Sequence, residues 1–190
     1  MTRNRLGWTV VVTALTLLTT SPALAQTPGG AAPSGFPPTS FLAPAKATWE
    51  SARGLVLGIA ELFPEDKYDF KPTPAVRPVR EILIHLIGEN YTFFSRISGE
   101  TLPSNDRFNA LKSRDEILKE LRASYDYGAK VWSGLTEEKA LELVEGRGGQ
   151  RVQRWSAALI AIADNMNHYG NLVVYARLNG LVPPRSAGRN

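Results

Sequence analysis

The sequence contains no cysteine and only two histidines among its 190 residues. The missing cysteines exclude disulfides, thiolate zinc sites and thiol-redox chemistry. Charge is also modest, with 22 basic and 18 acidic residues and a formal net charge of +4. No basic patch is interleaved with aromatic residues, so nucleic acid is not an expected partner. Because histidine is so scarce, the positions of His85 and His168 carry much of the information about function.

The first 25 residues have the pattern of a secretory signal peptide. Arg3 and Arg5 precede an apolar stretch over 8–18, and Ala23-Leu24-Ala25 forms a small-residue cleavage site. The apolar stretch is too short to span a bilayer. We therefore expect an exported protein, periplasmic or secreted, with no stable membrane anchor after cleavage; an uncleaved anchor is the alternative. Cleavage would lower the 22 basic residues to 20.

The rest of the chain has the length of one ordinary domain with short flanking segments. Residues 26–43 are rich in proline, glycine and alanine, which cannot bury an apolar surface, so this leader is expected to be disordered. The domain is expected over 44–184, and residues 185–190 form a flexible tail.

Four long segments show apolar residues at three- and four-residue steps, the spacing of an amphipathic helix. They cover 44–63, 78–98, 113–134 and 153–179. A shorter helix is expected over 136–144, and the glycine-rich segment 146–150 reads as a turn. Strand signals are weak. The sequence therefore predicts an all-α fold, a four-helix bundle with a short extra helix between the third and fourth long helices. The loop over 103–112 looks short enough for antiparallel neighbours.

Both histidines lie within predicted long helices, His85 on the second and His168 on the fourth. Asp164 precedes His168 by four residues, so the two share one helix face. Together the three side chains form a candidate metal site with an open coordination position, and imidazole with carboxylate suits Zn, Ni, Fe or Mn. The alternative is that His85 is a half-buried polar residue and that Asp164 pairs with a nearby arginine.

Two further residues are candidate catalytic groups. Glu89, four residues after His85, could be a fourth ligand or a general base. Tyr175 could orient a substrate or a ligand. The alternatives are a solvated glutamate on a helix face and a core tyrosine at a helix interface.

Two segments resemble the DinB-like family: residues 167–184, which include His168, and residues 70–86, which lead through several prolines to His85. The resemblance implies a four-helix bundle that holds a divalent metal through three histidines, one from the second helix and two from the last. His85 matches the first of these and His168 the third. Asp164 stands where the middle histidine is usual, so the site either survives as His-Asp-His or has decayed.

The resemblance implies a metal-dependent hydrolase or transferase that acts on a small molecule through metal-bound water. Relatives include thiol transferases, but their thiol cosubstrate is mainly cytoplasmic, so hydrolysis suits an exported member better. One alternative is a non-catalytic exported binding or stress-response bundle with a degenerate or structural metal site. Another is a metal-free cytokine-like or adhesion bundle. Relatives are often dimers, and the aromatic-rich helices are compatible with a homodimer.

Overall fold

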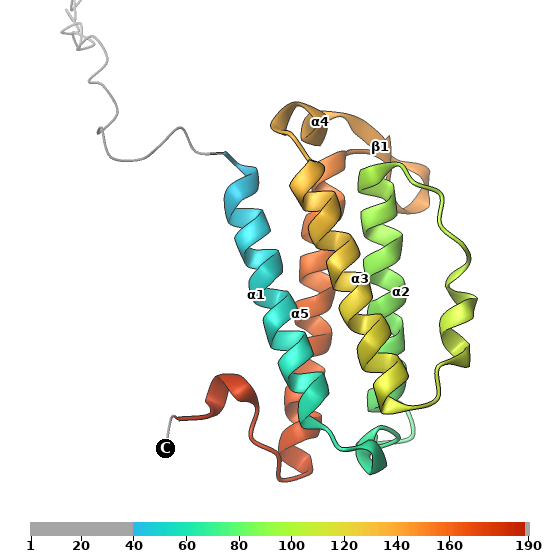
Figure 1. Ribbon diagram of the computed structural model, residues 1–190, viewed down its shortest axis with the longest axis vertical. Helices are drawn as coiled ribbons and strands as arrows, with labels where there is room; N and C mark the ends of the chain where they lie inside the picture. The colour runs from blue at the N-terminus through green and yellow to red at the C-terminus, as the bar shows by residue number, and fades with distance from the viewer. Residues whose placement is uncertain (1–39, 189–190) are drawn as a thin grey trace, which may run out of the picture. The chain divides into compact units, whose positions relative to one another are not determined.

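The computed structural model describes residues 40–188, and the predicted signal peptide lies outside the described residues. Four long helices pack side by side (Figure 1): α1 (Leu42–Leu62), α2 (Val79–Ser98), α3 (Arg114–Gly134) and α5 (Arg154–Leu178). The short helix α4 (Glu137–Leu141) lies between α3 and α5 in the chain. The all-α bundle with its extra helix is thereby confirmed.

The order of the helices around the bundle differs from a simple up-and-down arrangement. Both α1 and α2 pack against α3 and α5, so α1 and α2 occupy opposite corners. Helices α2 and α3 run in the same direction, and α1 and α5 run in the other (Figure 1). The prediction of antiparallel neighbours across the loop at 103–112 was wrong. About 15 residues from 99 to 113 can extend roughly 50 Å, whereas α2, with 20 residues, is about 30 Å long.

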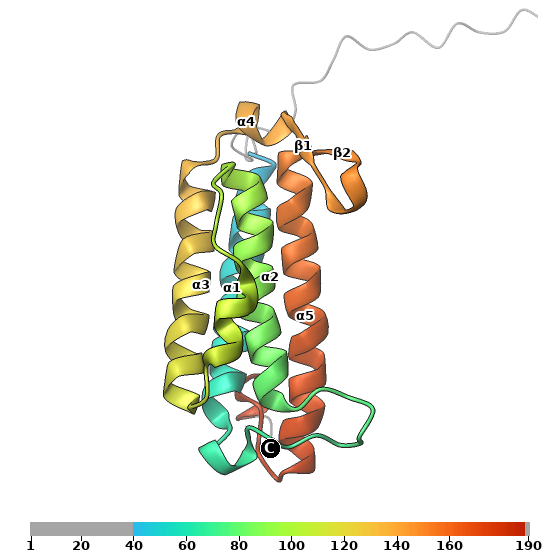
Figure 2. The same cartoon turned by 90° about the vertical axis from the view of Figure 1, so that its right-hand side faces the viewer.

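This return segment therefore runs back along the whole bundle (Figure 2). It contains a 3₁₀ turn, η2 (Asn105–Ala110), that packs against α2. Asn105 anchors it by donating to the carbonyl of Gly88 at 3.0 Å and to the Thr92 hydroxyl at 2.9 Å. A Cβ on Gly88 would lie 3.1 Å from the Asn105 amide nitrogen, so the missing side chain allows this close approach.

Local signals at the helix ends agree with the sequence. Ser113 and Glu116 form a capping box at the start of α3, because each side chain accepts a hydrogen bond from the other residue's backbone. Gly99 ends α2 with φ of 80°, a left-handed conformation that glycine adopts without strain. Pro78 immediately precedes the first residue of α2, where a missing backbone N–H costs nothing.

A small hairpin, which the sequence did not predict, follows α4. Strands β1 (Leu143–Glu145) and β2 (Arg151–Gln153) pair antiparallel, with Val144 opposite Val152. Each strand has only three residues, too few for an alternating pattern to be visible. The predicted turn over 146–150 lies between them, and Gly148 and Gly149 adopt φ near +80° there. The hairpin leads directly into α5.

The core lies between the four long helices and is rich in aromatic side chains. Trp49 packs against Phe94 and Tyr125, with ring centroids 4.5 Å and 5.1 Å apart. Gly128 makes this possible, because a Cβ there would lie 2.7 Å from the Trp49 ring. Along the described part of the chain, no helix combines the length and hydrophobicity that crossing a bilayer requires. After α5, the chain folds back so that Pro184 lies against Gly58 of α1.

Candidate metal centre and adjoining cavity

The three predicted ligands meet at the interface between α2 and α5. These helices are antiparallel neighbours, so His85 on α2 faces Asp164 and His168 on α5. One potential ligand atom from each residue lies within 4.8 Å of the others. The Nε2 atom of His168 is 3.6 Å from Oδ1 of Asp164, and the two imidazole rings are 4.8 Å apart at an interplanar angle of 78°. Of the two readings of Asp164, the structure supports the one that places it beside the histidines.

The polar atoms of this cluster are incompletely satisfied. His168 is buried, and Asp164 and His85 are half-buried. Oδ2 of Asp164 and Nδ1 of His168 are buried without a hydrogen-bond partner. Each such atom costs roughly 1–3 kcal/mol. The other buried side-chain atoms without partners in residues 40–188 are N–H groups of tryptophan and arginine, which cannot coordinate a cation.

The donor set fits a divalent cation. Two ligands of one tetrahedral zinc, each about 2.1 Å from the metal, lie about 3.4 Å apart. The 3.6 Å between His168 and Asp164 is close to this value, and a ligand atom of His85 lies within 4.8 Å of both. Burial lowers the pKa of His168, Asp164 opposes this effect, and the neighbouring His85 and Arg77 lower the pKa further. The lowered pKa favours the neutral imidazole, which is the form that binds metals.

A network of buried amides and hydroxyls lies next to the cluster and joins three helices. Asn165 on α5 donates to Oδ1 of Asn90 on α2 at 2.9 Å and to the carbonyl of Ala161 at 2.8 Å. Asn90 in turn donates to the hydroxyl of Ser124 on α3 at 3.1 Å, and the Tyr125 hydroxyl donates to Asn165. Asn165 follows Asp164 directly, so the network fixes α2 and α5 in the register that brings the cluster together.

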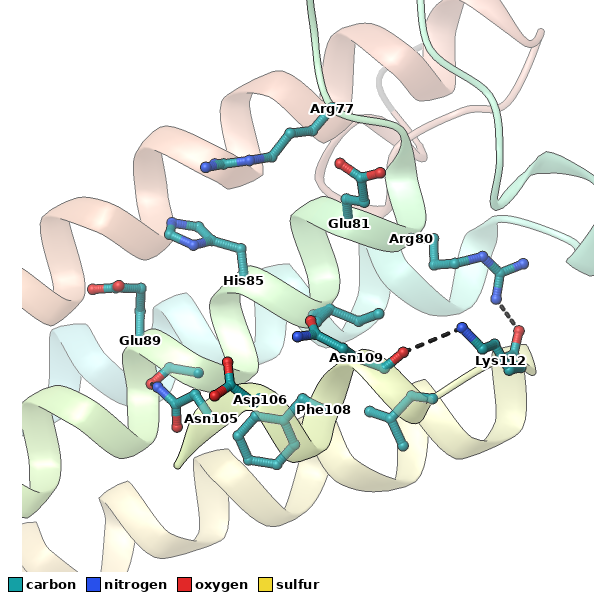
Figure 3. A pocket seen from close by; sticks show the side chains of 13 residues that line it. Arg77, Arg80, Glu81, His85, Glu89, Asn105, Asp106, Phe108, Asn109 and Lys112 are labelled. Atoms are coloured by element: carbon teal, nitrogen blue, oxygen red, sulfur yellow. Dashed lines mark hydrogen bonds between the residues drawn. The ribbon is translucent and has the colours of Figure 1, made fainter. Parts of the chain in front are cut away.

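A cavity of about 540 Å³ opens beside His85 (Figure 3). One wall is the face of α2 that carries Glu81, His85 and Glu89, and the opposite wall is η2 with Asn105 and Asp106. The unexpected return segment thus builds half of this cavity. Sequence reasoning missed these η2 residues because nothing in their spacing shows that the loop lies along α2.

The two predicted catalytic residues differ in position. Glu89 lines the cavity one helical turn beyond His85. Tyr175 is buried, and its hydroxyl donates to the backbone carbonyl of Arg77 at 3.1 Å while its ring packs edge-on against Phe70 at 5.9 Å. Its hydroxyl is thus bonded to the crossing loop before α2. Arg77 itself, which the sequence analysis did not select, lines the same cavity as His85.

Comparisons with known proteins agree with this fold. A DinB-like protein from Bacillus subtilis has a similar structure, with a TM-score of 0.59 and 19% identity over 73% of this chain and 93% of that one. A DinB-like protein from Bacillus cereus has a TM-score of 0.65 and 13% identity, covering 74% and 93%. A conserved protein from Enterococcus faecalis has a TM-score of 0.61 and 15% identity, covering 74% and 97%.

These identities are low, so the structural similarity shows the fold alone. Among curated proteins, none matches this sequence. The sequence profile of the DinB superfamily, however, matches residues 48–172, which contain all three residues of the His85, Asp164 and His168 cluster. The chain belongs to the DinB superfamily.

Proposed function

We propose that this protein binds a divalent metal through His85, Asp164 and His168 and uses it to act on a small molecule in the adjoining cavity. The observation that carries the proposal is the convergence of three ligand atoms within 4.8 Å, two of the residues having a buried polar atom without a partner. Membership of the metal-binding DinB superfamily supports it. Zn, Ni, Fe and Mn all suit imidazole with carboxylate.

The reaction class we propose is hydrolysis or group transfer. When bound, a divalent cation supplies Lewis acidity toward a substrate oxygen or sulfur. Asp164 contributes one negative charge, so a divalent cation on this site would keep a net positive charge toward the cavity. In this proposal Glu89, which lines the cavity one turn from His85, accepts a proton from a group held beside the histidines.

The direct test is elemental analysis of the purified protein, prepared without chelators or an affinity metal column. We expect about one equivalent of metal per chain, lost in His85→Ala and His168→Ala. Asn167→Ala, an exposed position on the same helix, is the matched control and should retain the metal. A protein that contains no metal and shows no thermal shift with added Zn²⁺, Ni²⁺, Fe²⁺ or Mn²⁺ would contradict the proposal.

A measurement of turnover distinguishes a metal-dependent enzyme from a non-catalytic binding protein. The open cavity beside His85 favours the enzyme, since a purely structural metal needs no access for a ligand. A screen of ester, amide and phosphoester substrates should find an activity that requires both the metal and Glu89. Full metal occupancy without any turnover would favour a binding protein.

We also propose that the protein is exported, on the strength of the pattern in residues 1–25. Expression of the full chain in a bacterial host, followed by mass spectrometry of the N-terminus, should show a mature protein that begins at Gln26. A protein retained with Met1 in the cytosol would contradict export and leave the metal proposal intact.

A further inference from the structure

Arg77 is held at the edge of the cavity by a contact with the helix that carries two of the ligands. The Tyr175 hydroxyl on α5 donates to the Arg77 carbonyl at 3.1 Å. Tyr175 lies seven residues after His168, which is two helical turns along the same face. The backbone of Arg77 is therefore fixed relative to the cluster, and its side chain lies beside His85 in the cavity (Figure 3).

The Arg77 guanidinium differs from that of Arg80, three residues later. Arg80 donates to Asp69 at 2.8 Å and to the Lys112 carbonyl, so its charge is already paired. Within residues 40–188, the guanidinium of Arg77 has neither an ion pair nor a hydrogen bond. An arginine whose guanidinium has no partner can form two parallel hydrogen bonds with an anionic group of a ligand.

The remaining charges of the cavity limit which anion fits. Three carboxylates, of Glu81, Glu89 and Asp106, line it without an ion pair in the described part of the chain. Two further cations line it, Arg80, which is paired with Asp69, and Lys112, whose ammonium donates to the Asn109 carbonyl. A ligand with several negative charges would face these three carboxylates, whereas one anionic group could lie between Arg77 and the metal site. The volume of about 540 Å³ is in the range of small-molecule sites.

We propose that Arg77 is the specificity-determining residue of the cavity and selects small molecules that carry one anionic group, such as a monocarboxylate. This inference rests on the proposed metal function, because the cation and Arg77 together form the positive end of the cavity. Tyr175 is a positioning residue in this arrangement, since it acts through the backbone of Arg77.

The test uses the full chain loaded with Co²⁺, whose visible absorption reports ligands that reach the metal. Butyrate is the monoanionic probe and succinate the dianionic one, titrated at constant ionic strength. Butyrate should perturb the Co²⁺ spectrum, and Arg77→Ala should weaken its binding at least tenfold. Succinate should bind no more tightly than butyrate. The Arg77→Ala protein should fold, because its side chain is exposed and Tyr175 bonds its carbonyl.

Lys112→Ala is the matched control, because Lys112 lines the same cavity and its ammonium bonds the Asn109 carbonyl at 3.2 Å. It should change butyrate binding less than twofold, and all variants should bind Co²⁺ with the same affinity. Unchanged butyrate binding in Arg77→Ala, or equal losses in both variants, would overturn the inference while the metal proposal stands. Failure of every variant to bind Co²⁺ would overturn both.

Discussion

Two sets of buried and half-buried polar groups adjoin each other where α2 meets α5, and they differ in how completely their side chains are hydrogen-bonded. In the amide network, Asn90, Ser124 and Asn165 form hydrogen bonds that satisfy their side chains within the protein. In the adjacent cluster, Asp164 and His168 each keep a buried atom without a partner. Asp164 and Asn165 are consecutive in the chain, so the contrast lies between neighbouring residues of one helix.

The difference indicates different purposes for the two sets. A fully paired buried network holds helices in one register and needs nothing from outside. A partly paired one destabilises the fold unless an external group completes it. The amide network therefore positions α2 against α5. The cluster of His85, Asp164 and His168 depends on that position, because its ligands come from both helices. Variants in the two sets should then have opposite effects on stability, which can be measured.

The largest effect is expected from Asn165→Ala. This change leaves Oδ1 of Asn90 and the Tyr125 hydroxyl buried without their present partners. With two groups unpaired, the free energy of unfolding should fall by about 3 kcal/mol. Urea denaturation measures the change, with Asn167→Ala at the exposed face as control. A loss no greater than that of the control would mean that the network does not hold the bundle.

The second variant, Asp164→Asn, should have the opposite effect on the metal-free protein. It removes a half-buried negative charge whose ion-pair contact within residues 40–188 is with His168 alone, so with chelator present the free energy of unfolding should rise by about 1 kcal/mol. Metal at 100 times its dissociation constant should stabilise the native protein by about 2.7 kcal/mol, and Asp164→Asn should lose most of that gain. Equal metal stabilisation in both proteins would remove Asp164 from the ligand set.

The sequence allowed the prediction of every long helix, because their apolar stripes, the capping box at Ser113 and the stop at Gly99 are local signals. It also allowed the three cluster residues to be selected, since i,i+4 spacing places Asp164 and His168 on one face. The direction of α3 was predicted wrongly because loop length alone does not fix where a loop runs. The cavity wall at η2 and the position of Arg77 beside His85 were missed for the same reason, because both depend on contacts between distant segments.

A third variant, Asp164→His, tests whether the side chain at position 164 is a ligand of the metal. It places an imidazole where the resemblance to the DinB-like family implies a histidine. Imidazole is a softer ligand than carboxylate, so the preference for Zn²⁺ over Mn²⁺ should increase by about tenfold. Competition titrations with a chromophoric chelator measure both affinities. Unchanged affinities for both metals would show that position 164 does not contact the ion.

The smallest expected effect is the loss of stability at acidic pH, which should arise from Glu116, a residue outside the amide network. Two backbone N–H groups, of Ser113 and Lys112, hold the pKa of Glu116 below its usual value. A carboxyl whose pKa is lower in the folded state stabilises the fold above its unfolded pKa, and this contribution is lost as pH falls through the folded pKa.

Between pH 7 and pH 3 the melting temperature should therefore fall less steeply in Glu116→Gln than in the unchanged protein. The destabilisation caused by Asn165→Ala should stay the same from pH 7 to pH 4, because the Asn90, Ser124 and Asn165 side chains do not ionise and burial raises the pKa of Tyr125 far from this range. If the Asn165→Ala deficit shrank in acid, the amide network would be coupled to the protonation of its neighbours Asp164 and His168, and the two sets would form one unit.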